Sequence, residues 1–140
     1  CRALGGKVGK AYSGWDIGIR KVRFTEEYIN DSLNGIPPSL SIIECHKDEV
    51  CEVPEGAQVL ACSDKTCVEM FKFGDYILGI QGHPEYNKDI LDNIIDQLLS
   101  NISFEKGFAE EAKLNVMEAE DDRKYWKMIC KSFLKVRWIT

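Results

Sequence analysis

The chain has 140 residues, of which 44% are hydrophobic and 29% charged, the composition of an ordinary soluble globular protein of about one domain. Its 18 basic and 23 acidic residues leave a net charge of −5, which argues against nucleic acid or an anionic membrane as partner. No apolar run reaches the roughly 18 residues of a membrane span, and residues 1–6 lack the apolar core that signal peptides carry, so we expect a cytosolic protein with a small or peptidic partner.

The N-terminal part carries signals for a helix end, two strands and a helical turn. Residues 1–4 resemble the last turn of a helix, which the pair Gly5-Gly6 ends because glycine adopts the left-handed conformation without penalty. We therefore expect the domain to be incomplete at its N-terminus. Residues 7–9 and 17–24 are strand candidates, and Thr25 can cap a helical turn that follows.

Further strand candidates lie at residues 41–45, 58–63, 68–73 and 76–81, after a loop at residues 34–38. Apolar side chains then recur about every 3.6 residues, as in an amphipathic helix, at Ile90, Leu91, Ile94, Ile95, Leu98, Leu99 and Ile102. The charge-rich remainder has a second helical stripe at Trp126, Ile129, Cys130, Phe133 and Leu134. This order of strands and helices indicates an α/β or α+β architecture, with residues 1–103 as the domain and residues 104–140 as a helical extension packed on it.

The six cysteines show no regular spacing, which argues against a disulfide framework. Most are expected to be reduced, buried thiols, above all Cys45 and Cys62 inside apolar strands. No Cys-x-x-Cys pair is present, so neither a metal site nor a cofactor is predicted.

The most informative stretch is Gly79-Ile80-Gln81-Gly82-His83-Pro84-Glu85, an apolar strand that runs into a histidine and a glutamate two positions apart. Pro84 fixes its own φ and biases His83 toward extended geometry, so both side chains are held at a strand end. A carboxylate beside an imidazole fixes its tautomer and stabilises the imidazolium. For an isolated His-x-Glu, a loop histidine without function is the more common alternative.

The stretch resembles the Gly-x-Gln-x-His-Pro-Glu signature of the class I glutamine amidotransferases, cysteine enzymes with a Cys-His-Glu triad on an open α/β sheet. Further pieces stand in that family's order, so that the resemblance covers residues 1 to about 100: Gly5-Gly6-Lys7-Val8, Trp15-Asp16-Ile17-Gly18, Cys45-His46-Lys47-Asp48-Glu49-Val50, Val53-Pro54-Glu55-Gly56-Ala57 and Ala61-Cys62-Ser63-Asp64. The resemblance implies a flavodoxin-like α/β fold, incomplete at its N-terminus and followed by C-terminal helices.

Within this family the chain is similar to the plant γ-glutamyl peptidases, which remove a γ-glutamyl group from glutathione conjugates, as in glucosinolate synthesis. The likeness lies in Ile43-Glu44-Cys45-His46, Ser63-Asp64-Lys65-Thr66, Val68-Glu69-Met70-Phe71, Gln81-Gly82-His83-Pro84-Glu85-Tyr86 and Asp121-Asp122-Arg123. It implies hydrolysis of a γ-glutamyl amide through a thioester, with His83 as general base and then acid and Glu85 orienting it. It also implies a place near the substrate's γ-glutamyl group for His46 and Asp48, although structural roles for both fit equally well, Asp48 as the cap of a turn.

The family's nucleophile lies in a Gly-x-Cys-x-Gly-x-Gln elbow, which this sequence does not contain. The family's spacing would place that thiol about 10 Å, or two helical turns, before Cys1. Two hypotheses follow: the chain is part of a cysteine hydrolase and inactive alone, or it is a shortened, non-catalytic binding or regulatory protein. The sequence does not indicate the oligomeric state.

Overall fold

The computed structural model describes residues 1–31, 35–101, 111–113 and 122–135. Its helices and strands, in chain order, are η1 (Arg2–Leu4), β1 (Lys7–Lys10), β2 (Asp16–Phe24), α1 (Glu26–Asp31), β3 (Ser39–His46), β4 (Asp48–Glu52), β5 (Ala57–Cys62), β6 (Met70–Phe73), β7 (Ile77–Ile80), α2 (Lys88–Asn101) and α4 (Arg123–Lys135). Within these residues, no helix is long and apolar enough to cross a membrane.

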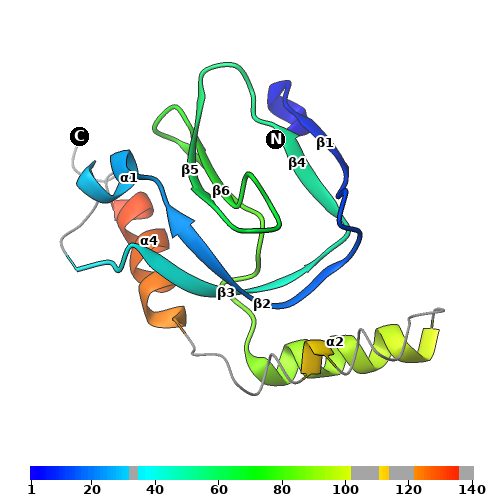
Figure 1. Ribbon diagram of the computed structural model, residues 1–140. Coiled ribbons are helices and arrows are strands. Elements are labelled where there is room, and N and C mark those ends of the chain that lie inside the picture. The colour runs from blue at the N-terminus through cyan, green and yellow to red at the C-terminus, as the bar shows by residue number, and fades with distance from the viewer. Residues whose placement is uncertain (32–34, 102–110, 114–121, 136–140) are drawn as a thin grey trace.

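The strands form one curled five-stranded sheet and one small two-stranded sheet (Figure 1). The larger sheet has the order β3-β2-β5-β6-β7, and β1 pairs with β4; each described pairing is antiparallel. The curl brings the chain after β7 back to β3, where the backbone N–H of His83 donates to the carbonyl of Ile43 at 2.7 Å. The predicted α/β class is confirmed, with strands that pair antiparallel in this part of the fold.

Helices cover both faces of the long β2–β3 ladder. Successive side chains of a strand point to opposite faces, so the two strands present two apolar sets. One set, Val22, Phe24, Leu40 and Ile42, packs with Trp126 and Ile129 of α4. Leu60 and Ala61 of β5 and Met70 of β6 join the same cluster. The opposite set packs with Leu91 and Ile95 of α2 and consists of Ile17, Ile19 and Ile43, with Ala112 from beyond that helix. Leu91 and Ile95 of the first predicted stripe, and Trp126 and Ile129 of the second, therefore form the buried helix faces of the core.

Local capping explains where the helices begin and where η1 ends. The Thr25 hydroxyl accepts the N–H of Tyr28 at 3.3 Å, as predicted, and Asn87 Oδ1 accepts the N–H of Ile90 at 2.8 Å at the start of α2. Gly5 has a left-handed φ of 94° and its N–H bonds to the carbonyl of Arg2, which ends the single turn η1.

Several sequence-based expectations differ from the structure. Asp48–Glu52 is not a turn capped by Asp48 but strand β4, because its backbone pairs with the distant β1. All six cysteines are free thiols, but none is fully buried: Cys45 and Cys62, expected to be the most buried, are only partly buried, as are Cys1 and Cys130, and Cys51 and Cys67 are exposed. Ile90 and Leu134, which belong to the predicted stripes, are exposed. The predicted boundary at residue 103 and the stripe residue Ile102 lie outside the described residues.

Gly79 in β7 stands directly opposite Phe71 in β6, and the ring of Phe71 lies over the position that a Cβ would take. A Gly79→Ala substitution would place this Cβ less than 3.0 Å from Phe71 ring atoms, so we expect it to lower the free energy of unfolding by about 1–3 kcal/mol. Urea denaturation checks this value. The cost should be smaller in a Phe71→Leu background, and an equal cost in both backgrounds would contradict the steric explanation.

Candidate active site

The segment after β7 is held by backbone hydrogen bonds on both sides. The Gln81 N–H donates to the carbonyl of Glu69 at 2.8 Å, and the His83 N–H donates to Ile43. The side-chain oxygen of Gln81 also accepts the N–H of Val50 in β4 at 3.3 Å. This hydrogen bond connects the two-stranded sheet to the segment after β7. The backbone that carries His83 is therefore anchored to three separate strands or strand ends.

His83 and Glu85 are brought together as the sequence predicts. Nδ1 of His83 lies 2.8 Å from Oε1 of Glu85, and the two side chains are 31% and 61% exposed. The ring of Tyr86 stacks on the imidazole, with centroids 4.1 Å apart and planes within 3°. If Nδ1 carries its proton toward the carboxylate, the Nε2 atom is the ring nitrogen able to accept another proton.

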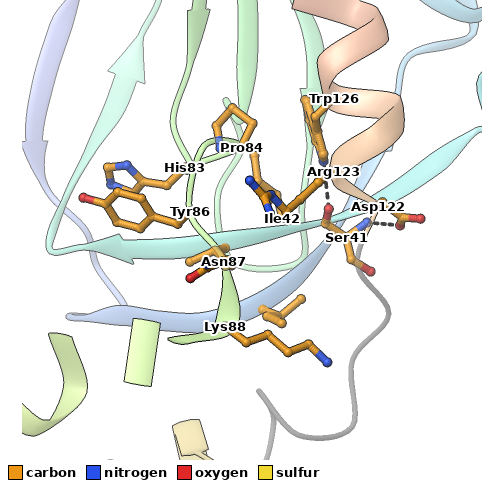
Figure 2. A pocket seen from close by; sticks show the side chains of 12 residues that line it. Ser41, Ile42, His83, Pro84, Tyr86, Asn87, Lys88, Asp122, Arg123 and Trp126 are labelled. Atoms are coloured by element: carbon orange, nitrogen blue, oxygen red, sulfur yellow. Dashed lines mark hydrogen bonds between the residues drawn. The ribbon is translucent and has the colours of Figure 1, made fainter. Parts of the chain in front are cut away.

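A pocket adjoins this pair, between the turn after β7, the middle of β3 and the start of α4 (Figure 2). His83, Pro84 and Tyr86 line it from the turn, and Arg123 lines it from α4. The backbone of Ser41 joins two of these walls, because its N–H donates to Asp122 at 2.6 Å and its carbonyl accepts the Trp126 indole N–H at 2.7 Å (Figure 2). The imidazole thus borders a cavity instead of being walled off in the core.

The structure does not bring His46 and Asp48 together in the same way. His46 is nearly buried at the end of β3, with Nε2 at 3.2 Å from Oε2 of the buried Glu44. Asp48 is exposed at the start of β4, and its side chain makes no hydrogen bond or ion pair within the described part of the chain. This geometry favours an internal role for His46.

Two buried glutamates lie behind the His83 segment, and the sequence patterns considered above do not point to them. Glu44 is 0% and Glu69 2% exposed. Burial is the main cause that raises the pKa of each carboxyl to about 8, and Asp16 adds to the effect at Glu44 as Glu44 does at Glu69. The signal that could have found them is a charged residue in the middle of two otherwise apolar segments, Ile42-Ile43-Glu44-Cys45 and Val68-Glu69-Met70-Phe71.

Asp16 is a third buried carboxylate in the same region, at the start of β2 and paired in register with His46. It is neutralised by its own partners, since Oδ1 lies 2.7 Å from Nε of Arg20 and 3.5 Å from Nζ of Lys65. Asp16 therefore pairs with two cations, whereas neither glutamate forms an ion pair with a lysine or arginine among the described residues.

The structure does not indicate an activated thiol. Burial raises the pKa of Cys45, with a smaller effect of Glu44, and burial also raises the pKa of Cys130, to which Glu85 contributes. A raised pKa lowers the thiolate fraction that nucleophilic attack requires. The described side-chain hydrogen bond of His83 is to Glu85 and not to a cysteine.

Comparison with known proteins identifies the class. Residues 1–98 match the family "Glutamine amidotransferase class-I", and the chain belongs to this family. Two solved glutamine amidotransferases share the fold: one from Thermotoga maritima has a TM-score of 0.69 at 21% identity, covering 96% of this chain and 55% of that one. The other, from Methylobacillus flagellatus, has a TM-score of 0.73 at 14% identity, covering 96% and 57%. The predicted glutamine amidotransferase-like fold is thus confirmed.

Among curated relatives, γ-glutamyl peptidase 5 of Arabidopsis thaliana is 49% identical over 139 residues, which are 97% of this chain and 55% of the relative. γ-Glutamyl peptidase 3 of the same plant is 46% identical over 140 residues, covering 96% and 55%. A glutamine-hydrolysing GMP synthase polypeptide from Methanocaldococcus jannaschii is 39% identical over 97 residues, covering 65% and 50%. The chain therefore resembles γ-glutamyl peptidases and spans about half of their length.

Proposed function

We propose that this chain supplies the histidine and glutamate of a Cys-His-Glu triad that hydrolyses γ-glutamyl amides, with glutathione conjugates as the substrate class. The observation that carries the proposal is the 2.8 Å contact between His83 Nδ1 and Glu85 Oε1 beside a pocket. The similarity to γ-glutamyl peptidases supports the choice of substrate.

In the proposed reaction, His83 Nε2 takes the proton of a thiol while the sulfur attacks the γ-carbonyl carbon and an S–C bond forms. The C–N bond then breaks, and the imidazolium returns the proton to the leaving amine. Water attacks the resulting thioester with His83 again as base, which releases the γ-glutamyl group as an acid and restores the thiol. Glu85 orients the imidazole and stabilises its charged form throughout.

The thiol of this reaction is proposed to come from outside the 140 residues, because they contain no Gly-x-Cys-x-Gly-x-Gln elbow. The purified chain is accordingly expected to release no glutamate from glutathione. Turnover by the chain alone that is lost in His83→Ala would contradict this expectation.

Activity is tested by joining the chain to the part of Arabidopsis γ-glutamyl peptidase 5 that lies outside the matched region. This chimera is expected to hydrolyse glutathione, and His83→Ala is expected to lower its kcat/KM by roughly 10²- to 10⁴-fold, the usual contribution of a general base. Glutamate release, measured at several substrate concentrations, provides both constants.

The matched control in the chimera is Cys62→Ala in β5, which should retain activity because this thiol has no role in the proposed reaction. A larger loss in Cys62→Ala than in His83→Ala would refute the assignment. A folded chimera without turnover would instead favour a non-catalytic binding or regulatory role.

A further inference from the structure

The carboxyl of Glu44 occupies a space that the lack of a side chain at Gly82 leaves open, directly beneath the site segment. Gly18 in β2 is the cross-strand partner of Glu44, and a Cβ on Gly82 would lie less than 3.0 Å from the Glu44 carboxyl. Glu69 shares this buried place, since each glutamate acts on the pKa of the other. The residue before His83 therefore rests against a buried carboxyl group.

Both glutamates are also joined to the site segment through the backbone. Glu69 accepts the Gln81 N–H on its carbonyl, and Ile43, the residue before Glu44, accepts the His83 N–H. A displacement of either carboxyl is thus passed to the backbone on each side of Gly82. Because interiors are closely packed, small shifts of this kind are not absorbed locally.

The charged and titratable groups around the pair leave it poorly compensated. Strand β2 contributes Asp16 and Arg20, which form an ion pair with each other. The loop after β5 contributes Lys65, whose Nζ lies 3.5 Å from Oδ1 of Asp16. From β3 comes His46, at 3.2 Å from Glu44. The Ser63 hydroxyl also lies near the pair and lowers the pKa of Glu69, and the Cys45 thiol interacts with Glu44. Within the described residues, the four carboxyl oxygens of the pair nevertheless have no hydrogen-bond partner of good geometry. Two ionised carboxylates in such a place would be strongly unfavourable.

We propose that Glu44 and Glu69 hold one proton between them and are positioning residues for His83. The proton supplies the missing donor and removes one of two adjacent negative charges, so the pair can pack against Gly82. Loss of that proton leaves two carboxylates that repel each other under the segment, and His83 moves away from its place against Ile43 and Glu85. For the proposed function, the consequence is a fall in kcat with little change in KM at alkaline pH.

The raised pKa values of the pair place this change near pH 8. The test uses the chain itself, labelled with ¹⁵N, because the sequence has only two histidines and hence two imidazole spin systems. A His83→Gln variant assigns the signals. From pH 5 to 10, the His83 imidazole is expected to show an inflection near pH 8 that Glu44→Gln and Glu69→Gln each remove, since glutamine mimics a protonated carboxyl.

Glu55→Gln, at an exposed glutamate in the turn before β5, is the matched control and should retain the inflection. In the wild type, hydrogen exchange is expected to show the protection factor of the His83 amide falling by up to tenfold per pH unit as the pH rises toward the transition, as for one linked proton, and levelling off above it. At pH 6 the two glutamine variants should retain the wild-type His83 signal.

The proposal would be overturned if the wild-type His83 signal showed no inflection near pH 8. It would also be overturned if both glutamine variants kept the inflection unchanged. If a variant does not fold, the wild-type titration alone tests the proposal. Since no turnover is measured, an inactive chimera would refute the proposed function and leave this result standing.

Discussion

Replacing Trp126 with alanine is expected to lower the free energy of unfolding by about 3–5 kcal/mol. The indole is 1% exposed and packs on Phe24, with ring centroids 5.8 Å apart, in the core between α4 and the sheet. The substitution also removes the donor to the carbonyl of Ser41. Urea denaturation followed by circular dichroism measures the loss without relying on tryptophan fluorescence.

Two variants separate packing from the hydrogen bond. Trp126→Phe retains most of the apolar contact and removes the indole N–H, so its cost should be clearly smaller than that of alanine. Met128→Ala, at an exposed position of the same helix, should change stability by no more than about 0.5 kcal/mol. If Met128→Ala were as costly as Trp126→Ala, the assignment of α4 to the core would be wrong.

Stability is expected to fall as the pH rises from about 5 to 8. The pair Glu44 and Glu69, whose pKa is raised to about 8 by burial, keeps its shared proton in the folded chain, whereas both carboxyls have the ordinary value of 4.5 when exposed. Between these values the folded state therefore holds one proton more than the unfolded state. Linkage then lowers the unfolding free energy by about 1.4 kcal/mol per pH unit for that proton, with no further loss above pH 8.

Other described groups have raised pKa values, but their ordinary values are 9.0 or higher, so their protons do not change the stability between pH 5 and 8. These groups are Lys7, Arg23, Lys113, Cys45 and Cys130. Denaturation midpoints at pH 5, 6, 7 and 8 measure the slope. Glu69→Gln should flatten it, whereas the control Glu55→Gln should not. Stability that rises over this range, or a slope that persists in Glu69→Gln, would contradict the prediction.

The sequence predicts the parts of the fold and site that depend on neighbours along the chain. The contact between His83 and Glu85 is of this kind, because Pro84 restricts the backbone between them. The stripes of α2 and α4 are also local, and Leu91, Ile95, Trp126 and Ile129 are buried as their spacing indicates.

Features that depend on distant strands could not be predicted in this way. Strand β4 exists through its pairing with β1, and its charged ends hide it in a pattern search. The meeting of Glu44 with Glu69 requires the curl of the sheet and the space left by the lack of a side chain at Gly82. His46 and Glu44 share one face of β3 because they are two residues apart, but the burial of Glu44 on that face depends on distant packing, which residue types alone do not determine.

The contacts of Ser41 with α4 have a consequence for association between molecules. A border strand with free N–H and C=O groups invites another chain to extend the sheet. In β3 the outward groups of Ser41 are taken by Asp122 and Trp126, and the carbonyl of Ile43 is taken by His83. The middle of β3 therefore offers no template for strand addition, and the helix that fills the core also protects the chain from edge-to-edge polymerisation at this border.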